Sequence, residues 1–219
     1  MKHNLPIDLY LIRHGNTFTS TDKVVQVGLK TNMPLTEQGF LQAKQLGQYF
    51  AVNNLIPSYI YTGTLLRQKQ TAQTISQALY LYSNCPIHQE HALEEIDYGL
   101  WEGLTTKEIT EHWANQLKDW EESLHWPENI FQGKFVDKKL ALQNWIQHIS
   151  KTHPPGSLIL AVSSNGVIRC ILSLIGNLWD KIVHEKRLRD YKVKTGHFCH
   201  LALQDGNLTI QTWNQSPLK

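Results

Sequence analysis

The chain has 219 residues, 41% of them hydrophobic and 18% charged, with a formal net charge of +2. These values are typical of a globular protein and fit one domain, which has room for one sizeable insertion. The balanced charge and the lack of a Lys/Arg run argue against a nucleic-acid partner. No apolar run approaches the ~18 residues of a membrane helix, and residues 1–6 lack the apolar region of a secretion signal. The three cysteines, Cys85, Cys170 and Cys199, form no C-x-x-C pattern, so we expect reduced thiols in a cytoplasmic protein.

The first predicted strand ends in an unusual group of residues. Residues 9–12 form an apolar run, which is typical of a strand buried on both faces, and Arg13, His14 and Gly15 follow at once. In an open α/β sheet, ligands bind at the carboxyl ends of the strands. We therefore expect Arg13 and His14 to face a ligand, with Gly15 allowing a close turn.

Two helices and a strand are predicted next. Thr36 is the expected N-cap of a helix whose Phe40, Ala43, Gly47 and Phe50 have the spacing of a face packed on the sheet. A short strand is expected over 57–62 and a helix over 65–82, with Arg67 in its first turn. A positive charge there opposes the helix dipole unless an anion lies nearby.

A loop rich in carboxylates separates these elements from a long helical region. Residues 86–93 form a strand or an extended link, and the loop over 93–103 contains Glu94, Glu95, Asp97 and Glu102. Residues 104–150 are predicted to be a largely helical insertion at one edge of the sheet. It is either a lid over a binding site or a helical layer without that role.

The C-terminal third supplies a second buried strand and a hairpin. Residues 158–162 are apolar and lead into Ser163, Ser164, Asn165 and Gly166, then a helix over 167–175. This order presents backbone amides to an anion, although Ser and Asn are also common N-caps. Residues 198–203 and 208–213 form the hairpin. The element order predicts an α/β fold, a three-layer α/β/α sandwich over 1–219 with a mostly parallel sheet, an antiparallel edge strand and the insertion.

These residues favour phosphoryl chemistry. If the two buried strands share one parallel sheet, His14 and Ser164 lie at the same edge. Arg13 and Arg67 would supply two guanidinium groups for an oxyanion. A neutral imidazole is a competent nucleophile toward phosphorus, and the loop over 93–103 offers carboxyl groups as proton donors.

Other chemistries lack their motifs. There is no H-E-x-x-H, and His197 and His200, three apart on a predicted strand, would face opposite sides, so no metal site is expected. Ser163 and Ser164 lack the G-x-S-x-G frame of a serine hydrolase. No GxGxxG or Walker A pattern is present, so no cofactor is expected.

Four segments in order resemble the histidine phosphatase superfamily, in the branch that includes cofactor-dependent phosphoglycerate mutase and many small phosphatases. The matching residues are Arg13-His14-Gly15 with Thr17; Pro34-Leu35-Thr36 with Gly39, Gln42 and Ala43 (P-L-T-x-x-G-x-x-Q-A); Leu66-Arg67 with Gln70-Thr71-Ala72 (L-x-R-A-x-Q-T-A); and Glu95 with Gly99, Trp101, Glu102 and Gly103 (E-x-x-x-G-x-W-E-G). The matching parts span residues 9 to 103 and 158 to 169.

The resemblance assigns roles to individual residues. It implies that His14 becomes phosphorylated, that Arg13 and Arg67 bind the phosphate, and that Glu95 supplies the acid. We add Asn16, Ser20, Ser164 and Asn165 as candidate phosphate-binding residues.

The chain also departs from the family pattern. The family's V-S-H-G-G-V-I-R segment has its second catalytic histidine where this chain has Ser164; Asn16 stands where Glu or Gln is usual, and Ser20 where Asn is usual. A serine can donate a hydrogen bond, but it is shorter and uncharged. We consider His197 as a candidate substitute for the missing histidine.

Three functions remain open at this point. The leading hypothesis is a phosphomonoesterase that acts on a small phosphorylated metabolite through a phosphohistidine on His14. A phosphoglycerate mutase-type phosphotransferase is the second, although the W-E-G form of the acid loop favours a phosphatase. The third is a weakened or silent phosphate-binding module, because Ser164 replaces the histidine.

Overall fold

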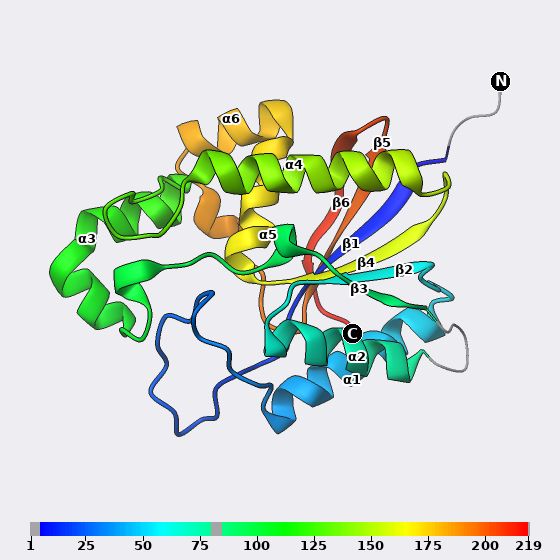
Figure 1. Ribbon diagram of the computed structural model, residues 1–219, viewed down its shortest axis with the longest axis horizontal. Helices are drawn as coiled ribbons and strands as arrows, with labels where there is room; N and C mark the ends of the chain where they lie inside the picture. Colours follow the sequence, from blue (N-terminus) through cyan, green and yellow to red (C-terminus); the bar gives the residue numbers. More distant parts are fainter. Residues whose placement is uncertain (1–4, 80–84, 219) are drawn as a thin grey trace.

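A six-stranded sheet in the order β3-β2-β4-β1-β5-β6 forms the centre of the molecule. The computed structural model describes residues 5–79 and 85–218. β1, β2, β3 and β4 are parallel to one another, whereas β5 is antiparallel to β1 and pairs with β6 in a hairpin (Figure 1). The strands are β1 (Ile7–Arg13), β2 (Tyr59–Thr62), β3 (Ile87–Gln89), β4 (Leu158–Ser163), β5 (Phe198–Gln204) and β6 (Asn207–Gln215). The predicted mostly parallel sheet with an antiparallel edge is confirmed.

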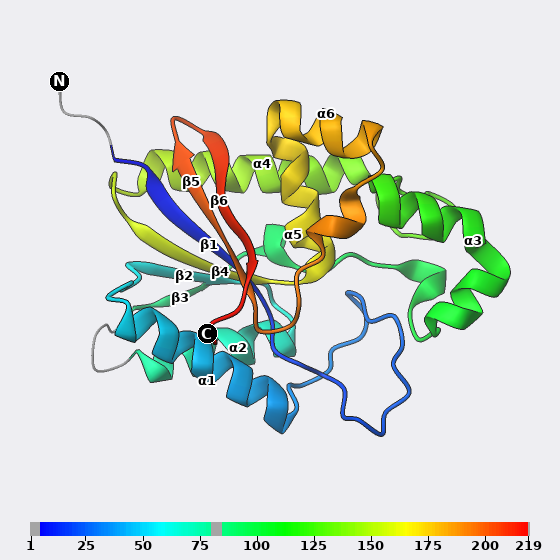
Figure 2. The same ribbon diagram turned by 180° about the vertical axis from the view of Figure 1, so that it is seen from behind.

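Helices cover both faces of this sheet. In both views, α1 and α2 lie on one side, and α4, α5 and α6 on the other (Figures 1 and 2). The α-helices are α1 (Glu37–Val52), α2 (Leu66–Ala78), α3 (Thr106–Ser123), α4 (Phe135–Thr152), α5 (Asn165–Ile171) and α6 (Gly176–His184). Short 3-10 helices cover His91–Leu93, Gly99–Trp101, Leu172–Leu174 and Leu188–Tyr191. The α/β fold with three layers is therefore confirmed.

The central strand β1 is buried on both faces, as its apolar run predicts. Leu9 and Leu11 join the core beneath α4 and α5, whereas Tyr10 and Ile12 join the core beneath α1 and α2. All four side chains are at most 5% exposed. Burying an aliphatic side chain of this size stabilises a fold by about 1.5–3 kcal/mol.

Two helix predictions needed correction. Phe40 is 40% exposed, because the buried face of α1 begins at Gly39 and continues through Ala43, Leu46 and Gly47. The helix predicted over 167–175 is α5 followed by a 3-10 turn, and the chain leaves helical geometry at Ile175 before α6 begins. The last residues of the helix predicted over 65–82 lie outside the described residues.

The two helices of the region 104–150 differ in how they lie relative to the sheet. α4 packs on the sheet through Leu142, Trp145, Ile146 and Ile149, which are all buried, so it belongs to the outer layer. α3 instead extends beyond the sheet (Figure 1). In the described parts of the chain, no helix combines the length and the apolar character needed to span a membrane.

Candidate active site

The site lies where β1 and β4 end next to each other. Arg13 is paired with Ser163 in the parallel register, and the backbone N–H of His14 donates to the Ser163 carbonyl at 3.0 Å. Ser164 follows directly. The structure thus brings His14 and Ser164 to the same edge of the sheet, as their positions after two parallel strands predict.

The turn after His14 is held by residues of both neighbouring helices. The Gly15 N–H donates to the Thr71 hydroxyl at 3.0 Å, and that hydroxyl donates to the Arg67 carbonyl at 2.7 Å. A Cβ on Gly15 would lie 2.4 Å from the carbonyl oxygen of Gly39, which explains the glycine. Motif residues of α1 and α2 therefore hold the backbone turn that follows His14.

The surroundings of His14 favour a neutral imidazole. Its Nδ1 lies 2.8 Å from the Gly15 carbonyl oxygen, which can only accept, so Nδ1 carries the proton and Nε2 keeps its lone pair. Burial, followed by the charges of Arg67 and Arg13, lowers the pKa of His14 well below 6.5. The side chain is 6% exposed. Both features favour the form that attacks phosphorus.

Arg67 is a buried cation and Arg13 a half-buried one, and both have unused donors. Arg67 is 1% exposed and donates to the carbonyls of Thr31 at 2.7 Å and Gly28 at 3.1 Å, while Arg13 donates to the Val193 carbonyl at 2.7 Å. In both side chains Nε–H is buried and has no hydrogen-bond partner among the described residues. Burial lowers the pKa of both guanidinium groups. Because a buried donor without an acceptor is costly, the pair fits a bound oxyanion.

Glu95 differs from the other carboxylates of its loop by its burial. It is 6% exposed, and its Oε1 accepts one hydrogen bond, from the Ile96 N–H at 2.9 Å. Burial raises the pKa of Glu95 above 4.5, against the opposing charges of Arg67 and Arg13. A Cβ on Gly166 would lie 2.8 Å from Oε1 of Glu95, so this glycine makes room for the carboxyl group. The environment of Glu95 favours a carboxyl that carries a proton.

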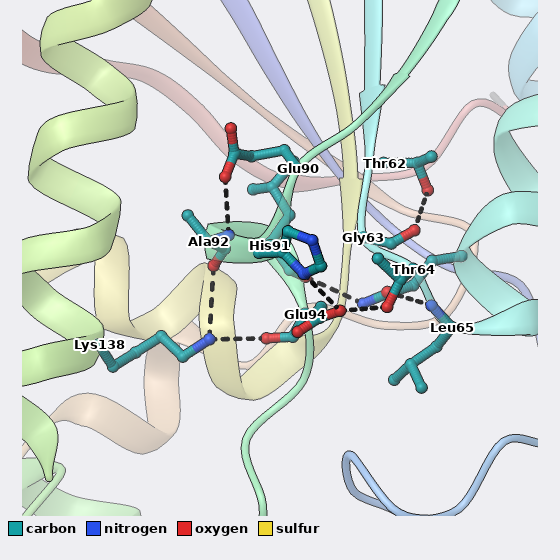
Figure 3. A network of polar contacts seen from close by, with 11 residues as sticks. Thr62, Gly63, Thr64, Leu65, Glu90, His91, Ala92, Glu94 and Lys138 are labelled. Atoms are coloured by element: carbon teal, nitrogen blue, oxygen red, sulfur yellow. Dashed lines mark hydrogen bonds and ion pairs between the residues drawn. The ribbon is translucent and has the colours of Figure 1, made fainter. Parts of the chain in front are cut away.

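Glu94, its neighbour, is part of a structural network (Figure 3). Its Oε1 contacts the Thr64 hydroxyl and lies 3.1 Å from Nδ1 of His91. Its backbone carbonyl accepts from Lys138 Nζ at 2.9 Å, which ties α4 to the acid loop. The carboxylate of Glu94 is therefore already engaged by Thr64 and His91.

Glu102 anchors a strap, defined here as residues 26–31, against the acid loop. Its Oε2 accepts from the Thr31 hydroxyl at 2.7 Å, its Oε1 accepts from the Lys30 N–H at 3.3 Å, and Leu29 N–H donates to the Ile96 carbonyl at 3.0 Å. Two strap carbonyls hold the Arg67 guanidinium. Glu102 therefore positions Arg67 through the strap. Asp97 instead pairs with Nζ of Lys30 at 3.0 Å.

The other predicted phosphate-binding residues differ in their placement. Ser164 is fully buried at the end of β4, whereas Ser20 is exposed in the segment after β1. The Asn16 amide donates to the Phe18 carbonyl at 2.6 Å, and Oδ1 of Asn165 accepts from the Val193 N–H at 2.8 Å. Their contact with phosphate stays a prediction.

Nδ1 of His197 lies 3.1 Å from the Asn214 carbonyl oxygen, and the use of this histidine as a substitute for the missing one stays a prediction. No group of three or more His, Cys, Asp or Glu in residues 5–79 and 85–218 could hold a metal ion.

Sequence reasoning missed Gln68, which is fully buried and contacts Ser164. A signal was present, since the L-x-R-A-x-Q-T-A pattern has alanine at this position. A buried amide where the pattern has a methyl group marks a local change in the site.

Comparison with known proteins agrees with this geometry. The chain is 30% identical over 189 residues to "Probable phosphoglycerate mutase GpmB" of Salmonella choleraesuis, covering 84% of this chain and 80% of that protein. It is 24% identical over 210 residues to "Phosphoserine phosphatase 1" of Hydrogenobacter thermophilus, covering 90% and 95%. The solved structure of the alpha-ribazole phosphatase from Shigella flexneri has the same fold, with a TM-score of 0.72 and 23% identity over 96% of this chain and 97% of that one.

The family assignment rests on nearly the whole chain. The model of the histidine phosphatase superfamily (branch 1) matches residues 9–216. The expected enzyme class, with phosphatase or mutase-type activity on small phosphorylated substrates, is confirmed at this level. The chain belongs to the histidine phosphatase superfamily, branch 1.

Proposed function

We propose that the protein is a phosphomonoesterase that hydrolyses a small phosphorylated metabolite through a phosphohistidine on His14. The observation that carries this proposal is the pairing of a neutral, buried imidazole with the guanidinium groups of Arg13 and Arg67, whose buried Nε–H donors have no partner among the described residues. Such donors match the oxygens of a phosphoryl group. The raised pKa of Glu95 supplies the remaining requirement, a carboxyl that can donate a proton.

The reaction proceeds in two steps, transfer of the phosphoryl group to His14 and hydrolysis of the phosphohistidine. Nε2 of His14 attacks phosphorus and forms the N–P bond as the bond to the leaving oxygen breaks. Arg13 and Arg67 stabilise the charge on the phosphoryl oxygens, and Glu95 gives its proton to the leaving alcohol. Glu95, now a carboxylate, then takes a proton from water while the water oxygen attacks phosphorus. The N–P bond breaks, phosphate leaves, and His14 and Glu95 return to their starting forms.

Two alternatives have their own support. Phosphotransfer of the mutase type is favoured by the 30% identical relative, which is named a probable phosphoglycerate mutase. A silent phosphate-binding module is favoured by Ser164, since losing one donor to the reacting oxygens typically costs about 2.7–4 kcal/mol in the transition state.

One experiment separates the three. Wild type and His14→Ala are incubated with an aryl phosphate and with phosphoglycerates, and both free phosphate and isomerised product are measured. We expect His14-dependent phosphate release and a phosphoenzyme that can be trapped in the wild type alone. Isomerisation without net phosphate release would favour the mutase. Absence of His14-dependent turnover, with phosphate still bound, would favour the silent module.

A further inference from the structure

Gln68 is held in one orientation by three contacts. It is fully buried near the start of α2, directly after Arg67. Its Nε2 donates to the Leu93 carbonyl at 3.1 Å and to Oγ of Ser164 at 3.0 Å, and its Oε1 accepts from the Leu65 N–H at 3.4 Å. Turning the amide over would place its oxygen against a carbonyl oxygen and its NH₂ against an N–H. The donor side of Gln68 therefore faces Ser164.

The neighbouring residues are shaped for this amide. A Cβ on Gly63 would lie 2.1 Å from Oε1 of Gln68, so only a glycine leaves the space. The Ser163 hydroxyl also donates to the Leu93 carbonyl, at 2.7 Å, which gives this carbonyl two donors. Replacing the amide by a smaller group would leave a buried carbonyl and a buried N–H with one partner fewer.

The contact decides what the Ser164 hydroxyl can do. A hydroxyl has one hydrogen to donate and two lone pairs. Because Oγ accepts from Gln68, the hydrogen of Ser164 is not used in that contact and is free to donate. A hydrogen bond accepted by the oxygen also strengthens the hydroxyl as a donor. Ser164 follows the residue whose carbonyl accepts from the His14 N–H, so Ser164 and His14 lie at the same edge of the sheet.

We propose that Gln68 is a positioning residue that directs the Ser164 hydroxyl toward the phosphoryl oxygens. This inference rests on the proposed function. The Ser164 hydroxyl, oriented by Gln68, donates in place of the histidine of the V-S-H-G-G-V-I-R pattern. Gln68 itself stands where the L-x-R-A-x-Q-T-A pattern has alanine, so the chain departs from both patterns at residues that contact each other. It follows that Ser164→His alone introduces an imidazole next to an amide that occupies the adjoining space, whereas Gln68→Ala together with Ser164→His clears that space.

A double-mutant cycle tests the proposal. Wild type, Gln68→Ala, Ser164→Ala and the double variant are assayed for kcat and KM with an aryl phosphate; Gln73→Ala, an exposed glutamine of the same helix, is the matched control. We expect kcat to fall about 10²-fold in Ser164→Ala and about tenfold in Gln68→Ala, with little change in KM. The double variant should be no worse than Ser164→Ala, because Gln68 acts only through that hydroxyl.

Two more variants separate the role of Gln68 from an effect on folding, and thermal melts show whether each variant is folded. Gln68→Glu keeps the size but replaces a donor by an acceptor, so a folded Gln68→Glu should lose as much kcat as Gln68→Ala. Gln68→Ala with Ser164→His should be more active than Ser164→His alone. Losses that multiply in the double variant, or an unchanged kcat in Gln68→Ala, would overturn the role of Gln68 while His14-dependent turnover remains. Absence of that turnover in the wild type would instead overturn the proposed function and this inference with it.

Discussion

Glu95→Gln is the sharpest test of the proposed acid. The substitution keeps the size of a side chain that is 6% exposed, and an amide oxygen can still accept from the Ile96 N–H, as Oε1 does at 2.9 Å. It removes the titratable proton and, in the second step, the base that accepts a proton from water. A positioned general acid contributes about 10²–10⁴ in rate, which corresponds to roughly 2.7–5.5 kcal/mol of the barrier. Stability at neutral pH should be unchanged or slightly higher, because the side chain no longer has to take up a proton when it is buried on folding.

The size of the loss should depend on the leaving group. An alkyl phosphate needs its leaving oxygen protonated, whereas a nitrophenolate leaves without a proton. We therefore expect kcat/KM, which reports phosphoryl transfer to His14, to fall by the full 10²–10⁴ for an alkyl phosphate and far less for nitrophenyl phosphate. The alkaline limb of kcat/KM, set by deprotonation of Glu95, should disappear.

Equal losses of kcat/KM with the two substrates would refute this role. Glu94→Gln is the matched control: its carboxylate already contacts Thr64 and His91, so both rates should change little.

Three further perturbations follow from the same geometry. Arg67→Lys keeps the charge but loses the guanidinium fork, so kcat/KM should fall about 10²-fold in steady-state assays. Arg189→Lys, at an exposed arginine, is the control, and an equal loss there would argue against a specific role of Arg67. Glu102→Ala releases the strap and should lower the free energy of unfolding by about 1.5–3 kcal/mol, measured by urea titration, with faster tryptic cleavage at Lys30. Unfolded His14 takes up its proton near pH 6.5, before the folded form does, so its contribution to stability is full above that pH and is lost as pH falls. The stability of His14→Asn should accordingly fall less on acidification than that of the wild type. Tm is measured for both proteins over a range of pH, and an equal fall of Tm in the two would contradict the lowered pKa.

The parts predicted from sequence are those with a local signal. A run of apolar residues that ends in Arg13 and His14 determines a buried strand and what lies at its end, because both faces of β1 meet helices. The choice of Glu95 among four carboxylates came from the family resemblance. Burial gives the physical reason for that choice, and burial depends on packing that sequence spacing does not reveal.

The sequence predicts which strand ends meet, but not the side-chain contacts between distant parts of the chain. Gln68 and Ser164 are 96 residues apart, and neither has a pattern that points to the other. The amphipathic face of α4 predicts that the helix packs against something, but a lid and a sheet layer bury the same apolar residues. Only the fold decides that Trp145 lies in the core beside the sheet.

The charge of the buried site leads to a last prediction. Arg13 and Arg67 carry two positive charges, His14 favours its neutral form, and Glu95 offsets at most one charge. Without a ligand, the guanidinium groups bear a desolvation cost with an unused N–H each. A dianion that accepts these donors should therefore stabilise the fold, by about 2.7 kcal/mol at 100 times its Kd.

Thermal melts with phosphate, vanadate and a matched concentration of chloride measure this effect. We expect Tm to rise with the two oxyanions and not with chloride, and the rise to shrink in Arg67→Lys, which lacks the fork but keeps the charge. An equal rise in Arg67→Lys would mean that the anions bind elsewhere. An equal rise with chloride would mean that screening, and not the shape of the site, stabilises the protein. Because the melts need no turnover, they test the anion site separately from the chemistry proposed for it.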